Sequence, residues 1–183
     1  MTILQNKLAK ILAFCGMALA LGYVASFIKI YSLPNGGSVT LISMFFICLI
    51  GYWYGLKVGL MAAVAYGLLQ LIQKPMYIHP VQICLDYLLG FGALGLSGLF
   101  KDRKNGLILG YLVAVFGRFC FVFLAGLMWI TYYSPELNIG AVITGSAAYN
   151  GSYIAIEAII TVVIISLPPV KKAMAKVKEL ATQ

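Results

Sequence analysis

Charge is what this sequence has least of. Only 10% of its 183 residues are Asp, Glu, Lys or Arg, whereas 62% are hydrophobic. Soluble domains carry roughly 25% charged residues, so this composition excludes an ordinary water-soluble fold. In lipid the backbone must satisfy its own hydrogen bonds, which helices do within one segment. We therefore expect an all-α integral membrane protein.

Cysteine and histidine are also scarce. Cys15, Cys48, Cys84 and Cys120 lie in apolar stretches without any Cys-x-x-Cys pair, and His79 is the single histidine. This pattern predicts no disulfide framework, no metal site and no cofactor. The sequence also contains no Ser-His-acid set, phosphate loop or ATP-binding motif. We therefore expect no catalytic residues and no self-powered pump.

Apolar stretches occupy most of the chain. A membrane-spanning helix needs about 20 apolar residues, and stretches of about this length are predicted as spans at 8–30, 38–54, 56–73, 82–100, 106–130 and 141–168. The second stretch is short, so a merged or re-entrant region over 38–73 is the alternative. Short loops separate the stretches, which predicts a single transmembrane domain over 1–183 that forms a six-transmembrane-helix bundle, with a basic tail at 170–183.

Lysine and arginine are distributed unequally between the loops. If the N-terminus is inside, ten cationic residues fall on the cytoplasmic side and two, Lys29 and Lys74, fall outside. Cytoplasmic loops collect Lys and Arg, so both termini are predicted to be cytoplasmic in a multi-pass protein of a bacterial plasma membrane. Topology and attraction to the lipid bilayer account for the net charge of +8, which requires no nucleic-acid partner.

Three charged residues lie well inside the apolar stretches, namely Asp86, Arg118 and Glu157. An intramembrane carboxylate costs at least about 2.5 kcal/mol on insertion scales. Arg118 and Glu157 fall at a similar depth, which predicts a structural ion pair. Asp86 has no such partner at its own depth, about 8 Å below the outer boundary at 1.5 Å per residue. We expect it to face a cationic ligand. The alternative is that Asp86 is protonated, or bonded to the backbone or to Lys74.

One polar stripe runs along the last apolar stretch. Ser146, Asn150, Tyr153, Glu157 and Thr161 follow one another at steps of three or four residues, so they share one helix face. That face is predicted to point into the bundle. Ser146 and Asn150 lie nearest to the depth of Asp86, and an asparagine amide can both donate and accept hydrogen bonds at the edge of a heterocycle.

Aromatic residues gather near the predicted outer boundary. Most of them are expected to form an interface belt, and one or two are expected to stack on a ligand ring. These residues are Tyr77, Tyr87, Trp129, Tyr132 and Tyr149.

Small residues recur at helix-packing spacing in the first stretch. Ala18, Gly22 and Ala25 lie on one helix face, and such faces let helices approach closely in lipid. The face is predicted either to pack inside the bundle or to dock a partner protein.

The sequence resembles the substrate-capture subunits of energy-coupling-factor vitamin transporters, most closely the thiamine-specific branch. The resemblance covers the whole length. The stretches that carry it most densely are 33–40, 79–87, 92–95 and 149–153. It implies a six-helix protein, not an enzyme, that binds a vitamin from outside. It also implies docking, through small residues of the first helix, onto a membrane coupling subunit driven by two ATPases.

The resemblance also implies roles for particular residues. Asp86 is similar to the acidic residue that faces the thiazolium ring, Tyr87 to its aromatic neighbour, and Asn150 to the asparagine at the ring edge. Tyr77 matches a loop tyrosine of the family, and Trp129 could take the role of an aromatic residue that stacks on the ligand.

The chain departs from the family pattern at two positions. The family tends to place a histidine where this chain has Val122 and a tyrosine near Gly145. The implied ligand is therefore thiamine or a related pyrimidine, thiazole or other flat vitamin. Residues 31–40, with Gly36-Gly37, are expected to close over the site.

Two alternatives come from other functional classes. One is an intramembrane enzyme that uses Asp86, Glu157 and His79, and the other is a scaffold subunit without a ligand. Loss of turnover in His79→Ala would favour the first, and a harmless Asp86→Leu substitution would favour the second.

Overall fold

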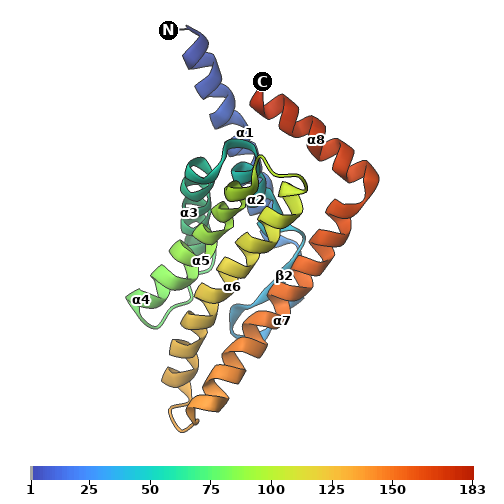
Figure 1. The fold of residues 1–183 in the computed structure, drawn as a ribbon. Helices are drawn as coiled ribbons and strands as arrows, with labels where there is room; N and C mark the ends of the chain where they lie inside the picture. The colour runs from blue at the N-terminus through green and yellow to red at the C-terminus, as the bar shows by residue number, and fades with distance from the viewer. Residues whose placement is uncertain (1) are drawn as a thin grey trace.

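The computed structural model describes residues 2–183, and almost all of them are helical (Figure 1). Four continuous helices are long and apolar enough to cross a membrane: α1 (Thr2–Phe27), α3 (Leu56–Gln73), α6 (Gly106–Tyr133) and α7 (Ile139–Ser166). A fifth candidate span, Pro80–Phe100, combines several short helical segments. The predicted all-α membrane class is confirmed.

The second predicted span, 38–54, differs in the structure. Ser38–Thr40 forms strand β2, and helix α2 covers only Ser43–Tyr54. Twelve residues of helix are about 18 Å long, less than the roughly 30 Å hydrocarbon core. Nine of these twelve residues are buried, so α2 is a central packing helix. With five candidate spans in residues 2–183, the count of six stays a prediction.

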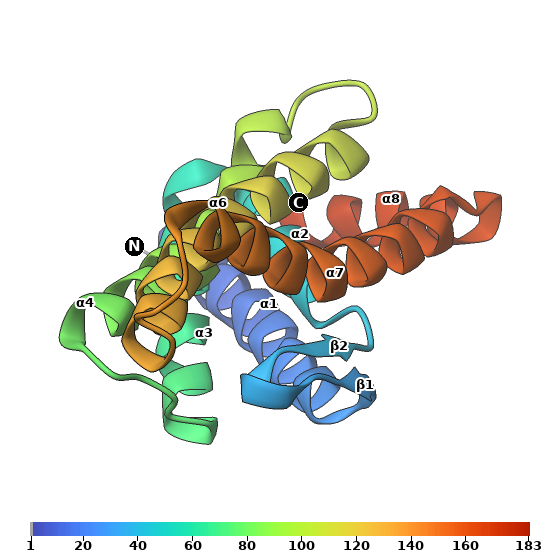
Figure 2. The same cartoon turned by 90° about the horizontal axis from the view of Figure 1, so that it is seen from below.

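A β-hairpin connects α1 to α2. Strand β1 (Lys29–Ser32) pairs antiparallel with β2, with Lys29 opposite Thr40 and Ser32 opposite Ser38. Its tip is the short 3-10 helix η1 (Pro34–Gly36), where Asn35 has φ 58° and Gly36 has φ 97°. Figure 2 looks onto the end of the molecule opposite the termini and shows the hairpin beside α1.

The span at Pro80–Phe100 changes its winding along its length. It begins as α4 (Pro80–Ile83), widens into the π-helical segment η2 (Cys84–Leu89), and continues through α5 (Gly90–Gly92) into the 3-10 helix η3 (Ala93–Phe100). The tight end packs among glycines of α2 and α3. A Cβ added to Gly59 of α3 would lie 2.9 Å from Gly95 O of η3 and 2.7 Å from Gly51 Cα of α2, so the three backbones meet directly there.

The hydrophobic core surrounds α2. This helix contacts α1, α3, η3 and α6. The large side chains buried there with essentially no exposure are Ile47 and Ile50 of α2, Tyr66 of α3, Leu94 of η3 and Tyr111 of α6. Burial of this apolar helix leaves the outer faces of the longer helices to meet lipid.

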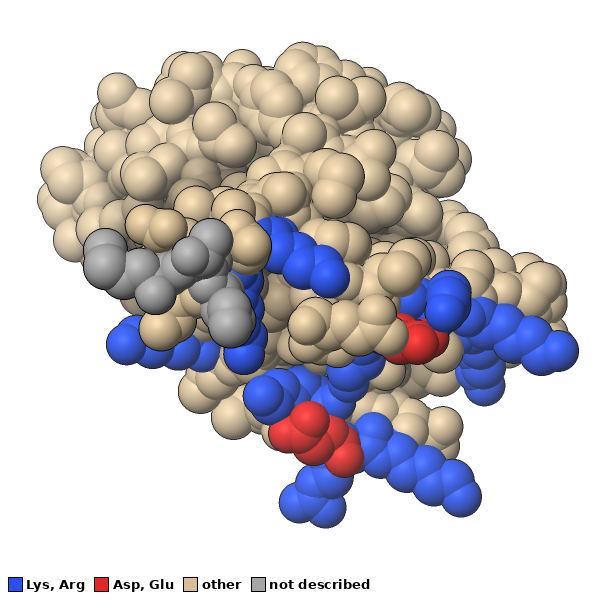
Figure 3. Space-filling model, turned by 90° about the horizontal axis from the view of Figure 1, so that it is seen from above, with Lys and Arg blue, Asp and Glu red and all other residues tan. Residues whose placement is uncertain are grey.

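Both termini lie at one end of the molecule (Figure 1), and Lys and Arg side chains gather at that end (Figure 3). The predicted basic tail is a helix, α8 (Pro168–Thr182), that folds back onto α2. Tyr54 Oη donates a hydrogen bond to Ala181 O over 3.1 Å, and Lys178 Nζ lies 3.9 Å from the Tyr52 ring centroid. Which side of the membrane this end faces stays a prediction.

Candidate functional site

A cavity of about 610 Å³ lies in the half of the bundle away from the termini. Its walls come from the ends of α1 and α3, the β-hairpin, the π-helical segment η2, and the facing parts of α6 and α7. This volume is in the range of small-molecule sites, about 300–1,000 Å³. Three of the four stretches that carried the family resemblance, 33–40, 79–87 and 149–153, therefore meet around one space.

Five of the six predicted ligand residues line this cavity: Asp86, Tyr87, Trp129, Ser146 and Asn150. Tyr77 is not among its lining residues and is 53% exposed. The loop before α4 instead contributes Lys74 and Met76 to the wall, because Tyr87 holds that part of the loop in place.

Asp86 is a carboxylate with few protein partners. Among residues 2–183, the hydrogen bond that it accepts comes from Gln82 Nε2, at 3.3 Å. The alternative of a bond to Lys74 is not formed, because the ion pairs among residues 2–183 are Lys101–Asp102 and Lys176–Glu179. The Asp86 carboxylate therefore retains acceptor capacity toward the cavity.

Tyr87 braces the mouth of the cavity. Its hydroxyl donates to Lys74 O over 2.6 Å and accepts from Met76 N over 3.0 Å. Its ring lies nearly parallel to that of Phe91, with centroids 6.4 Å apart. Because the hydroxyl is occupied, the part of Tyr87 that is free for a ligand is the ring.

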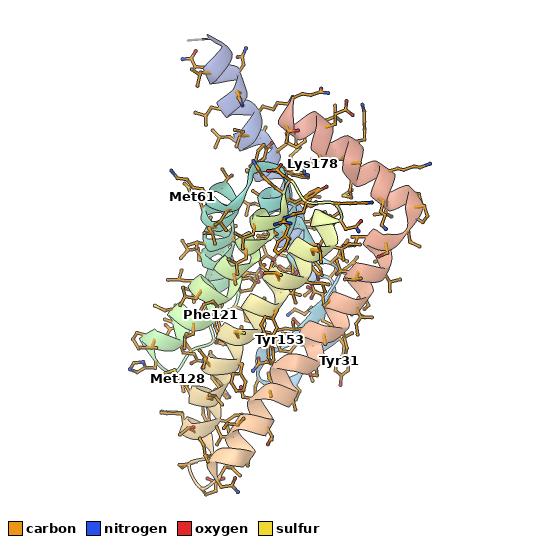
Figure 4. The ribbon with its side chains drawn as sticks, in the orientation of Figure 1. Tyr31, Met61, Phe121, Met128, Tyr153 and Lys178 are labelled. Carbon is orange, nitrogen blue, oxygen red and sulfur yellow. The ribbon has the colours of Figure 1, made fainter. Side chains whose placement is uncertain are left out.

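Asn150 and Ser146 form a connected polar pair on α7. Asn150 Nδ2 donates to Ser146 O over 3.1 Å, and Asn150 Oδ1 accepts from Tyr153 Oη over 3.1 Å. Ser146 Oγ donates to Phe123 O over 2.7 Å. Figure 4 shows Tyr153 between α7 and α6. The predicted inward direction of this polar stripe is confirmed, since Ser146, Asn150 and Glu157 are all buried.

The predicted Arg118–Glu157 ion pair is not formed within residues 2–183. Glu157 is 3% exposed and accepts four hydrogen bonds from the end of the hairpin and the start of α2. The donors are Thr40 N at 3.0 Å, Thr40 Oγ1 at 2.7 Å, Ser43 Oγ at 3.3 Å and Met44 N at 3.3 Å. The end of β2 and the start of α2 thus present backbone N–H groups and short hydroxyl side chains to the carboxylate. These groups lose little conformational entropy when they are fixed, whereas a long arginine side chain would lose much more.

Arg118 is stabilised differently. Its Cζ atom lies 3.6 Å from the centroid of the Phe91 ring, a cation–π contact. Its buried Nε and Nη1 atoms have no hydrogen-bond partner among the described residues, and the side chain lines the cavity. Buried donors without partners are rare in proteins, so Arg118 offers hydrogen bonds to whatever occupies the cavity.

The hairpin tip is held over the cavity by α7. Tyr149 Oη accepts a hydrogen bond from Gly37 N over 2.9 Å and donates one to Pro34 O. Asn35, Gly36 and Gly37 line the cavity. Ser38 and Thr40 of the hairpin also line it, so part of 31–40 forms one wall of the cavity. Closure of residues 31–40 over a bound ligand stays a prediction.

The predicted docking face of α1 packs inside the molecule. Ala18 is 2% exposed and Ala25 is 7% exposed. A Cβ added to Gly22 would lie 2.9 Å from Ile47 Cδ1 of α2. The internal-packing alternative is therefore correct for these three residues, because α2 needs a close approach to α1 on this side.

Sequence reasoning missed several residues of the site. Gln82 precedes Asp86 by four residues, a spacing that places two helical side chains in contact, so this partner was detectable. The roles of Thr40 and Tyr149 depend on contacts more than 100 positions apart in the chain. No local pattern marks such contacts.

Comparison with known proteins agrees with the family resemblance seen in the sequence. The family described as Thiamine transporter protein matches residues 12–177. The thiamine transporter ThiT of Bacillus subtilis (strain 168) is 32% identical over 150 residues, with 74% of this chain and 77% of that protein covered. A solved structure of ThiT from Listeria monocytogenes superposes with a TM-score of 0.66 at 21% identity, over 87% of this chain and 94% of that chain, which shows a shared fold. The chain belongs to the thiamine transporter protein family.

Proposed function

We propose that this protein is the thiamine-capture subunit of an energy-coupling-factor importer in a bacterial plasma membrane. It binds the vitamin from outside and is not an enzyme. Family membership and the cavity support this function. The single observation that carries the proposal is the Asp86 carboxylate. It lines the cavity together with the aromatic residues Tyr87 and Trp129, and among residues 2–183 it accepts a hydrogen bond from Gln82 alone.

The cavity walls match the two rings of thiamine. Asp86 neutralises the thiazolium cation, and at about 5 Å with an effective dielectric of 20 the attraction is at most roughly 3 kcal/mol. Tyr87 and Trp129 supply ring faces for stacking. Asn150, Ser146 and Arg118 line the same cavity, and Arg118 Nε and Nη1 have no partner among the described residues. In this proposal they supply hydrogen bonds to the pyrimidine edge.

Isothermal titration of the purified protein with thiamine tests this proposal. Wild-type protein is expected to bind with release of heat. Asp86→Asn, which keeps the shape and removes the charge, is expected to weaken binding by about tenfold or more. Asp102→Asn is the matched control, because Asp102 is an exposed acid outside the cavity. Absence of thiamine binding by the wild-type protein would refute the proposal.

A related heterocyclic vitamin or a thiamine precursor is the second candidate ligand. Val122 and Gly145 line the cavity where the resembling family tends to place histidine and tyrosine. These residues leave space and remove two hydrogen-bonding groups. Mass spectrometry of small molecules that copurify with the protein would distinguish this ligand from thiamine.

We further propose a single domain over 1–183 with both termini in the cytoplasm and α2 completing a sixth crossing together with the hairpin. The gathering of Lys and Arg at the terminal end supports this orientation. Labelling of single introduced cysteines with an impermeant reagent in whole cells checks it, since residues 102 and 171 should be protected and residue 137 should react.

The proposed partners are a membrane coupling subunit and two ATPases. Because Ala18, Gly22 and Ala25 are buried, the docking face is assigned to the opposite side of α1. There Ala9, Ala13, Gly16 and Ala20 form an exposed stripe of small residues. A Cβ added to Gly16 meets no atom within 4 Å, so this stripe leaves room for a second helix.

A further inference from the structure

The helix that carries Asp86 is wound differently where it borders the cavity. Residues Cys84–Leu89 form a π-helical turn between the short helices α4 and α5. Such turns are rare and occur frequently at functional sites. Asp86 and Tyr87 are consecutive residues of this turn, and both line the cavity.

A wide turn helps adjacent residues to face the same space. In an α-helix consecutive side chains are separated by about 100° around the axis. A π-helical turn hydrogen-bonds over five residues in place of four, so it has more residues per turn and a smaller angle between neighbours. In the π-helical turn the side chains of Asp86 and Tyr87 therefore point in more similar directions than they would in an α-helix.

Gly67 of α3 makes room for this turn. It is buried, and a Cβ added to it would collide with the carbonyl oxygen of Tyr87. The same Cβ would lie 3.0 Å from the Tyr87 carbonyl carbon and 3.2 Å from Phe91 Cβ. These are backbone and near-backbone atoms, so they cannot swing aside as the end of a flexible side chain can. A larger residue at 67 must displace the turn, and Asp86 with it.

Gln82 fixes the carboxylate from the other side. It is 3% exposed, and its Nε2 atom donates to Asp86 Oδ2 over 3.3 Å. Its Oε1 atom accepts from Ile78 N over 2.9 Å. The amide is thus held at both ends, and it links the loop before α4 to the orientation of the Asp86 side chain.

We infer that Gly67 and Gln82 are positioning residues that aim Asp86 at the ligand and so make the site selective for a cationic ring over an uncharged ring of the same shape. The inference rests on the proposed function and extends it to the basis of selectivity. Both residues act through Asp86, so neither needs to contact the ligand itself.

The test compares two ligands, thiamine and an analogue in which a neutral aromatic ring replaces the thiazolium. In Gln82→Met and in Gly67→Ala, the affinity for thiamine is expected to fall by about tenfold or more. The affinity for the neutral analogue is expected to change much less, because a neutral ring has no charge–charge attraction to the Asp86 carboxylate. Gly151→Ala is the matched control, since its Cβ meets only Phe119 Cε2, at 3.7 Å.

A double substitution separates positioning from general loosening. In Asp86→Asn, the further change Gln82→Met is expected to cost little additional thiamine affinity, since the charge that Gln82 orients is gone. Equal losses for both ligands, or additive losses in the double variant, would overturn the inference while wild-type thiamine binding still upheld the proposed function. A wild-type protein that binds neither ligand would overturn both. Should Gly67→Ala fail to fold, Gln82→Met decides the question alone.

Discussion

Two carboxylates lie inside this bundle under opposite conditions. Glu157 is surrounded by four donors from Thr40, Ser43 and Met44, whereas Asp86 has one donor, Gln82, among residues 2–183. A buried charge is tolerated when its lone pairs are satisfied. The first carboxylate is therefore a structural anchor, and the second is the one that we propose a ligand satisfies. Depth in the sequence separated the two carboxylates correctly, but it gave Glu157 the wrong partner, Arg118.

Substitution of Glu157 tests its role as an anchor. Glu157→Leu leaves four donors without their acceptor, and each buried orphan costs about 1–3 kcal/mol, so the melting temperature in detergent is expected to fall strongly. Glu157→Gln retains one acceptor oxygen, so its melting temperature is expected to fall less. Arg118→Met is the control, because Arg118 is not paired with Glu157. An equal fall in melting temperature for Glu157→Leu and Arg118→Met would instead favour an ion pair between Arg118 and Glu157.

At the scale of elements, the sequence predicts the long helices well and the segments around the site poorly. The stretches 56–73, 106–130 and 141–168 closely match α3, α6 and α7, because an apolar run of this length has few alternatives in lipid. The hairpin at 29–40 and the π-helical turn at 84–89 were not predicted. The hairpin depends on contacts with α7 and the π-helical turn on contacts with α3, and these contacts are distant in the chain. The choice between internal packing and docking at Gly22 likewise depends on its contact with α2.

The hairpin is expected to control the departure of the ligand. Tyr149→Phe removes the two hydrogen bonds that hold its tip at Pro34 and Gly37, so bound thiamine is expected to dissociate several-fold faster, in line with about 1 kcal/mol per hydrogen bond. Stopped-flow fluorescence of the bound protein measures this rate. Tyr132→Phe, at an exposed tyrosine outside the cavity, is the control. An unchanged dissociation rate in Tyr149→Phe would argue against a closing role for the hairpin.

At the scale of the whole molecule, the proposed ligand site and the proposed docking face lie on different surfaces. The cavity lies between α6, α7 and the hairpin, and the exposed stripe of small residues lies on α1. Ligand binding in the isolated subunit and assembly with a coupling subunit are therefore expected to be separable by mutation.

Gly16→Leu tests this separation. A large side chain on the exposed stripe should prevent a close helix approach and abolish copurification with the coupling subunit, with thiamine affinity unchanged. Ala155→Leu makes the same kind of change on an exposed position of α7 and is expected to assemble normally. Normal assembly of Gly16→Leu would place the docking face elsewhere.

The most direct measurement of the central claim is an experimental structure of the protein with thiamine bound. The account predicts the thiazolium ring inside the cavity with the Asp86 carboxylate within about 4–6 Å, the range in which an opposite charge stabilises it. Thiamine bound outside this cavity, or Asp86 turned away from the ring and satisfied by protein groups alone, would contradict the account.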